Sequence, residues 1–173
     1  SGNQVTVAAG TLTLAKYSAY ANQTLTVPQT AYKLAEFRLT GGSTEGVNLD
    51  TITLALPAAY TSTNITPADI TELYVVYGSK TTVTKATGGT SQSWSINEVL
   101  ASSGTLDVKV YANLSTSVQT ASTTVASLTI SGTSQNSGSA VTSATAVAGQ
   151  TITVGAGTLT IAVDASSPVQ ANV

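Results

Sequence analysis

Apolar and hydroxyl-bearing residues alternate along most of this 173-residue chain, and this pattern limits the possible fold more than any other feature. In one stretch the period of two places Leu106, Val108 and Val110 on one face of a strand, with Asp107 and Lys109 on the other. Helical periodicity is nearly absent. The chain is therefore predicted to be all-β, with one face of each strand in a core and the other in water.

The alternating segments are short and numerous, and turn-forming pairs such as Gly41-Gly42 and Gly88-Gly89 lie between them. A single sheet of this many strands would leave one apolar face in water, so two sheets must pack face to face. We expect a β-sandwich with Greek-key crossings. The predicted strands cover residues 5–7, 11–16, 24–27, 32–39, 51–56, 70–77, 81–86, 93–100, 105–111, 123–130, 140–147, 151–154 and 158–163.

Two short stretches could interrupt the strands. Thr66-Pro67-Ala68-Asp69 has a capping hydroxyl, a proline at the first helical position and a carboxylate in the first turn, so it predicts a single helical turn. Residues 95–98, Ser-Ile-Asn-Glu, match a capping box, but residues 93–100 also fit a strand with a bulge. The strand is the favoured interpretation.

The end of the chain repeats its beginning. Residues 4–15 (QVTVAAGTLTLA) recur 147 positions later as residues 151–162 (TITVGAGTLTIA), with 8 of 12 identities. This spacing predicts a β-sandwich domain at residues 1–147. Residues 148–173 are then either the start of a next domain or a donor strand that replaces its equivalent in a neighbouring subunit.

Both interpretations predict head-to-tail assembly. The edge strand of a sheet offers unpaired N–H and C=O groups, and a strand from the next unit satisfies them while placing alternate side chains in the core. We therefore expect the contact between units in the repeated segment. Its predicted residues are Thr151, Ile152, Thr153, Val154, Leu159, Ile161 and Val163.

Composition removes most catalytic machinery. The chain has no cysteine and no histidine, which excludes thiol and imidazole nucleophiles, disulfides and the usual zinc ligands. Charged residues make up 8% of the chain against about 25% in an ordinary soluble domain, and the eight acidic residues are scattered singly. A catalytic carboxylate pair is not expected. We predict a protein that is not an enzyme and has no catalytic, cofactor or metal site.

Two weaker signals compete with a simple surface role. Glu45, Asn48 and Asp50 around Gly46 are the nearest approach to a calcium loop, and solvation explains them better. Lys16, Lys33 or Lys109, facing Asn113 beside Glu36, would be the candidates for an isopeptide crosslink. Ordinary lysines at strand edges are the favoured interpretation.

Aromatic residues allow two interpretations. The tyrosines could line a glycan-binding face beside the lone Trp94, or they could fill the core and pair across strands. The core role is favoured. The tyrosines are Tyr17, Tyr20, Tyr32, Tyr60, Tyr74, Tyr77 and Tyr111.

Four segments carry a resemblance to a known family. They are residues 73–78 (LYVVYG), 93–96 (SWSI), 101–110 (ASSGTLDVKV) and 157–168 (GTLTIAVDASSP). Together they resemble the immunoglobulin-like tandem repeats of large bacterial secreted or cell-surface proteins. The resemblance implies an immunoglobulin-like β-sandwich strung along a fibre or surface layer. One departure is that KYSAY at residues 16–20 stands where the second copy has VDASS.

These observations predict a non-enzymatic structural subunit or repeat of an extracellular filament, assembled by strand complementation. The alternative is an adhesin or carbohydrate-binding module, so a glycan is a possible partner besides a second copy of the chain. No nucleic acid is expected, because the formal net charge is −2 and no basic stripe is present. No apolar run reaches the roughly 18 residues of a membrane span. Because the sequence opens at Ser1, we expect a processed or excised product, with a cleaved secretory signal as one route.

Overall fold

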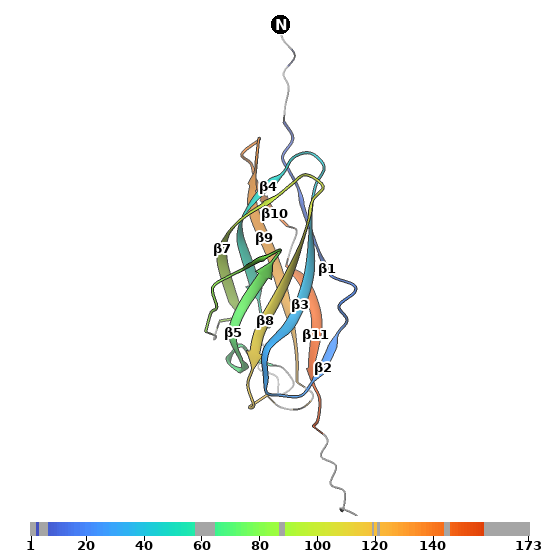
Figure 1. Ribbon diagram of the computed structural model, residues 1–173, viewed down its shortest axis with the longest axis vertical. Coiled ribbons are helices and arrows are strands. Elements are labelled where there is room, and N and C mark those ends of the chain that lie inside the picture. Colours follow the sequence, from blue (N-terminus) through green and yellow to red (C-terminus); the bar gives the residue numbers. More distant parts are fainter. Residues whose placement is uncertain are drawn as a thin grey trace, which may run out of the picture.

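The computed structural model of the chain is a β-sandwich of two sheets, elongated along the strand direction (Figure 1). The structure describes residues 3, 7–57, 65–86, 89–118, 120, 122–143 and 146–157. The predicted all-β class and the packing of two sheets are confirmed.

The first sheet has the strand order β1-β3-β8-β5-β6 and the second β2-β11-β9-β4-β7, with β10 pairing beside β9. The first sheet comprises β1 (Leu12–Lys16), β3 (Gln29–Gly41), β8 (Thr105–Leu114), β5 (Ile70–Tyr77) and β6 (Lys80–Thr81). The second comprises β2 (Gln23–Leu25), β11 (Val147–Val154), β9 (Thr123–Ser134), β4 (Val47–Ala55) and β7 (Ser91–Leu100), with β10 at Ala140–Thr142.

Alternation along the strands builds the core between the sheets. Val108 and Val110 of β8 and Ile52 and Leu54 of β4 are fully buried, and Leu106 is partly buried. Each buried aliphatic side chain contributes about 1.5–3 kcal/mol relative to an exposed one. The period of two therefore determines which face of each strand packs inward.

The helical turn predicted at residues 66–69 is confirmed. The 3₁₀ helix η1 spans Pro67–Asp69, and the Asp69 carboxylate accepts hydrogen bonds from the Thr66 N–H at 3.0 Å and the Thr66 hydroxyl at 2.7 Å. The strand predicted at residues 93–100 is also confirmed as part of β7. Ile96 and Asn97 form a bulge there, because Glu98 pairs with Leu49 and Ser95 with Thr51.

Two predicted strands are wrong in extent. Residues 81–86 were expected to be one strand, but the pairing of β6 ends at Thr81 and a single bridge joins Lys85 to Leu73. Residues 140–147 were also expected to be continuous, whereas β10 ends at Thr142 and β11 begins at Val147. Alternation along the sequence cannot reveal where a chain leaves a sheet, because this depends on the partner strand.

The predicted boundary between residues 147 and 148 falls inside β11, which is an inner strand of the second sheet. The predicted strands at residues 5–7 and 158–163 lie almost wholly outside the described residues. None of the helices in the described part of the chain has the length and hydropathy that a membrane crossing requires.

Candidate functional site

The first half of the second repeat copy lies inside this unit's own sandwich. Thr151, Ile152, Thr153 and Val154 form the end of β11, which pairs antiparallel with β9 and parallel with β2. Ile152 is 1% exposed and Val154 2%, so both belong to the core. The other predicted interface residues lie outside the described part of the chain, and they are Leu159, Ile161 and Val163.

A bulge in β11 brings a glycine against the opposite sheet. The register between β11 and β9 shifts between Ala148 and Thr151. A Cβ atom on Gly149 would lie 2.8 Å from the Ala35 Cβ and 2.9 Å from the Phe37 Cζ, both on β3. Carbon atoms do not approach this closely without displacement, so the position requires glycine.

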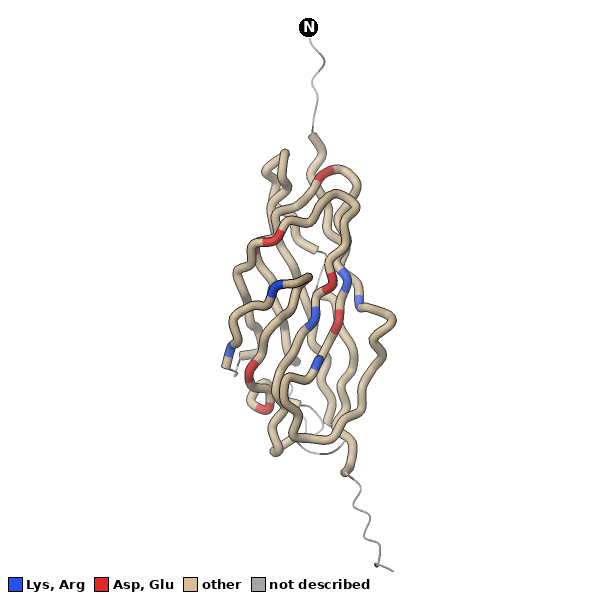
Figure 2. Tube along the Cα trace, in the orientation of Figure 1, with Lys and Arg blue, Asp and Glu red and all other residues tan. Residues whose placement is uncertain are grey.

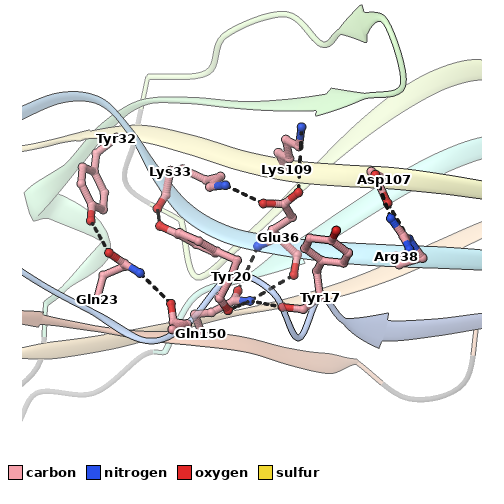
Figure 3. Close-up of polar contacts among 11 residues, drawn as sticks. Tyr17, Tyr20, Gln23, Tyr32, Lys33, Glu36, Arg38, Asp107, Lys109 and Gln150 are labelled. Carbon is pink, nitrogen blue, oxygen red and sulfur yellow. Dashed lines mark hydrogen bonds and ion pairs between the residues drawn. The ribbon is translucent and has the colours of Figure 1, made fainter.

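The next residue, Gln150, holds the chain where β1 leaves the first sheet (Figure 3). Its side chain is fully buried, and its Oε1 accepts a hydrogen bond from the Glu36 N–H at 2.9 Å. Its Nε2 lies within hydrogen-bond distance of the carbonyl oxygens of Tyr17, Tyr20 and Glu36, at 3.1, 2.9 and 3.3 Å. The Glu36 carbonyl also accepts from the Tyr17 N–H at 2.9 Å, so the Gln150 amide extends the pairing of β3 just beyond the end of β1.

The two copies of the repeated motif lie at opposite ends of the sandwich. The Gly10 N–H donates to the Ser134 hydroxyl at 2.9 Å, and the Val154 N–H donates to the Ser122 carbonyl at 2.9 Å. Between these points runs β9, whose 12 residues span roughly 36 Å. In Figure 1 the chain accordingly enters at one end of the long axis and leaves at the other.

The second half of the first repeat copy is β1. Leu12 and Leu14 face the core with 6% and 7% exposure, whereas Thr13 is exposed. Among the described strands, β1 is an edge strand that pairs with β3. Upstream of it, Val7 is 54% exposed.

Charged residues gather on the outer face of β3 and β8 (Figures 2 and 3). The buried Glu36 carboxylate pairs with the Lys33 ammonium and lies 3.9 Å from that of Lys109. Beside it, the Arg38 guanidinium bonds both Asp107 oxygens, at 2.8 and 3.2 Å. The hydrogen bonds from Arg38 hold the pKa of the Asp107 carboxyl below its ordinary value. The cluster is internally neutralised apart from one positive charge.

Half-buried tyrosines surround this charged cluster. Tyr74 and Tyr111 stack with ring centroids 5.3 Å apart. The Lys33 ammonium lies 3.9 Å from the ring centroid of Tyr20, and burial raises the pKa of the Tyr20 hydroxyl. The expected pairing across strands is confirmed for the stacked pair, because Tyr74 of β5 lies opposite Tyr111 of β8.

The remaining aromatic residues divide differently. Trp94 and Tyr77 are buried in the core, and the Trp94 indole N–H donates to the Val83 carbonyl at 2.8 Å. Trp94 therefore does not join the outer tyrosines. Tyr60 lies outside the described residues.

The candidate residues for calcium and for a crosslink make other contacts, and the solvated surface role expected for Glu45 is wrong. Glu45 is buried, and its carboxylate accepts hydrogen bonds from the Ser137 hydroxyl and from the N–H groups of Asn136 and Ser137. These bonds, the Ser137 hydroxyl first, lower the pKa of Glu45. The Asn113 amide oxygen accepts from the Ala31 N–H rather than facing a lysine. Within the described residues no three acidic side chains gather as a metal site would require.

Lysines cover the far edge strand, β7. The Lys80 ammonium donates to the Asn97 carbonyl at 2.7 Å and pairs with the Glu98 carboxylate at 2.7 Å. The Lys85 ammonium donates to the Ser93 carbonyl. Lysine side chains on an edge strand oppose the addition of another strand.

No protein-family model matches the chain, and a search of curated proteins finds no match. Among solved structures, the chain is similar to Spo0M, the sporulation control protein of Bacillus subtilis, at 10% identity and a TM-score of 0.35. That match covers 87% of this chain and 51% of the other, so the chain spans about half the length of the protein it matches. A likeness this weak carries no argument about function.

Proposed function

We propose that this chain is a non-enzymatic structural unit of an extracellular filament or surface fibre, in which units join head to tail by β-strand complementation. One observation carries the proposal. In the second copy, residues 151–154 are the end of β11 and lie at one end of the sandwich. In the first copy, the motif leads into β1 at the opposite end. The β11 half and the β1 half of one motif are adjacent in sequence, but their places lie at opposite ends of one sandwich. In the proposed assembly each motif therefore spans two consecutive units.

In this proposal the donated strand is residues 158–163. Leu159 and Ile161 correspond to Leu12 and Leu14, and we expect them in the β1 place of the next unit, with Val163 following. Each buried aliphatic side chain adds about 1.5–3 kcal/mol to the contact. Thr151, Ile152, Thr153 and Val154 stay in their own sandwich and form the near side of the joint. The contact is heterologous and does not close on itself, so it generates a filament.

The same joint serves separate chains and repeats of one longer chain. In separate chains, residues 158–163 must displace β1 of the next chain or pair beside it. In tandem repeats, one continuous segment supplies β11 to one domain and β1 to the next. The immunoglobulin-like Greek-key character of the sandwich is also part of the proposal. It is supported by the crossings from β3 to β4, β7 to β8 and β8 to β9, each of which changes sheet.

Negative-stain electron microscopy tests the proposal. The purified chain is expected to form filaments at high concentration, and truncation after Gly157 is expected to abolish them while the sandwich stays folded. Ile161→Asp is expected to act like the truncation, because it places a charge in the β1 core position. Thr160→Asp is the matched control, since its counterpart Thr13 faces solvent. Filaments that survive both the truncation and Ile161→Asp would contradict the mechanism.

A second candidate function is an adhesin or glycan-binding module. The outer face of β3 and β8 favours it, because the Tyr74–Tyr111 stack lies near the charged cluster around Glu36. Tyrosine rings and charged groups together are suited to sugar recognition. Glycan-array binding that is lost in Tyr111→Ala and kept in Tyr77→Phe would support this function.

A further inference from the structure

The strands of the two sheets differ in charge. Five of the six lysines and arginines in the chain lie on strands of the first sheet, against three acidic residues there. The described strands of the second sheet carry no cation and two acidic residues, Asp50 and Glu98. The first sheet therefore has an excess of two positive charges, although the formal net charge of the chain is −2. Figure 2 shows the lysines and the arginine gathered around the middle of the long axis.

We infer that the outer face of β3 and β8 binds an acidic polysaccharide, whose sugar rings lie against tyrosine rings and whose carboxylates meet lysine ammonium groups. The inference rests on the second candidate function, a glycan-binding module, and names the class of its ligand. It does not depend on the head-to-tail joint, because the face lies on the flat side of the first sheet rather than at the ends of the sandwich.

Tyrosine and lysine side chains form a row across three strands of this face. Tyr74 of β5 and Lys33 of β3 both lie opposite Tyr111 of β8. Tyr20 continues the row, because the Lys33 ammonium lies 3.9 Å from the centroid of its ring. Neighbouring strands are about 4.8 Å apart, so the three strands span roughly 10 Å. The row therefore offers aromatic surface on which the apolar C–H groups of sugar rings can pack.

Lys109 supplies a positive charge beside this row. It lies two residues before Tyr111 on the same side of β8, so the two Cα atoms are roughly 6.8 Å apart. The Lys33 ammonium is hydrogen-bonded to the Glu36 carboxylate, whereas the Lys109 ammonium lies 3.9 Å from it, beyond hydrogen-bond distance (Figure 3). The Lys109 side chain is 37% exposed. Lys109 can therefore turn toward a ligand carboxylate while Glu36 keeps Lys33 as its partner.

The backbone of this face is not free to pair with an added strand. β8 pairs with β3 and β5, and β3 pairs with β1 and β8. Their N–H and C=O groups are used within the sheet, so side chains must recognise the ligand. An acidic peptide lying across the strands would use the lysines and leave the tyrosine row without a matching partner. A chain of acidic sugars uses both, which is why we favour it as the occupant.

Titration calorimetry of the full-length chain with polygalacturonate tests the inference. The fully methyl-esterified polymer is the neutral counterpart, because esterification removes the carboxylate charge and keeps the sugar ring. Poly-L-glutamate is the acidic polymer without sugar rings. We expect binding to polygalacturonate alone. We also expect it to weaken as the salt concentration rises from about 0.01 to 0.15 M, which shortens the Debye length from about 30 to 8 Å.

Two substitutions separate the charge from the ring. Lys109→Gln is expected to weaken binding about tenfold through loss of a charge-assisted contact, and Lys109→Arg should bind like the wild type. Tyr111→Ala is expected to weaken binding by a similar factor. Thr142→Glu is the matched control, because it changes the net charge as much as Lys109→Gln but lies exposed on β10, beside the second sheet. A cooperative thermal transition by circular dichroism shows that each variant is folded.

The outcomes distinguish this inference from the functions already proposed. Equal affinity for the acidic polymer and its ester, or full binding in Lys109→Gln, would overturn the inference and leave a glycan-binding function standing. Equal affinity for poly-L-glutamate would show that charge alone is recognised and would also overturn it. So would the absence of binding to polygalacturonate, in which case the glycan array still decides the second candidate function. Filaments in the electron microscope decide the head-to-tail assembly independently.

Discussion

The edge strands on the two long sides of the sandwich differ in length and in the side chains that cover them. On the β7 side, a 10-residue edge strand has carbonyl groups bonded by Lys80 and Lys85, and its Glu98 pairs with Lys80. On the other side, the edge strands β1 and β2 have five and three residues, and the chain between them is held by Gln150. Lysine side chains on the first side oppose the addition of further strands, while on the second side β1 and the end of β11 belong to the segments that the sequence repeats.

In the proposed assembly, strands are exchanged only on the side that has the short edge strands. Long, flat edges promote uncontrolled association, and lysines on an edge are a common defence. A unit that polymerises by strands needs one permitted contact and protection elsewhere. The four predictions below test the contrast, from the largest expected effect to the smallest.

Removing β11 is expected to unfold the sandwich. Truncation after Ala146 deletes an inner strand together with buried Ile152 and Val154, each worth about 1.5–3 kcal/mol, and the Gln150 bonds, from a domain whose total stability is about 5–15 kcal/mol. Circular dichroism should show loss of the cooperative thermal transition. Truncation after Gly157 should preserve it. A cooperative transition after both truncations would show that β11 is dispensable.

Gln150→Leu keeps the volume of the side chain and removes its amide. The Glu36 N–H and the carbonyls of Tyr17 and Tyr20 then lose a buried partner, so we expect about 3 kcal/mol or more of destabilisation. Urea denaturation measures the change. Gln135→Leu, an exposed glutamine, is the control and should stay within about 0.5 kcal/mol of the wild type. Similar values for the two variants would contradict the role assigned to Gln150.

Glu45 should make stability depend on pH. Its pKa is lowered in the folded state, so its contribution is complete above the unfolded pKa of about 4.3 and is lost as the pH falls through the lower folded value. Glu45→Gln should therefore be less stable than wild type at pH 7 and should lose less on acidification. Urea midpoints at pH 7 and at about pH 3 give the comparison. A parallel decline in both proteins would rule out this linkage.

Lys80→Ala combined with Lys85→Ala should change association more than stability. Lys80 is exposed and Lys85 is half-buried, and exposed ion pairs such as that of Lys80 contribute about 0–1 kcal/mol, so the unfolding free energy should change little. The uncovered β7 edge should increase self-association, which sedimentation velocity detects. Lys16→Ala, on the opposite side, serves as the control. Unchanged association in the double variant would mean that the lysines do not protect this edge.

The sequence predicts the regular part of this fold and misses the contacts that position it. Alternation identifies the strands because burial of one face depends only on the spacing of residues, as at Leu106, Val108 and Val110. The turn at Thr66 and Asp69 is local and was equally predictable. Gln150 was not, because its partner Glu36 lies 114 positions away in the sequence. An amide in an alternating strand gives no indication of burial by itself.

The repeat shows how such a residue could have been found. Residues 4–15 and 151–162 establish the offset, and one further step upstream exposes a Gly–amide pair in both copies. The sequence alone gives this pair no significance. The structure does, because it shows what Gly149 and Gln150 contact. The strand predicted at residues 81–86 fails for the same reason. Lys85 turns toward the β7 carbonyl of Ser93, and local spacing does not encode this contact.

The direction of the terminal strands has a mechanical consequence. β1 runs inward from one end of the sandwich along β3, and β11 runs outward to the other end along β9. A pulling force applied between the two ends loads both strands along their own length, in shear across their hydrogen bonds. Several of these bonds must then break together, rather than one after another as in peeling. Each unit is therefore expected to resist stretching along the axis on which the chain enters and leaves.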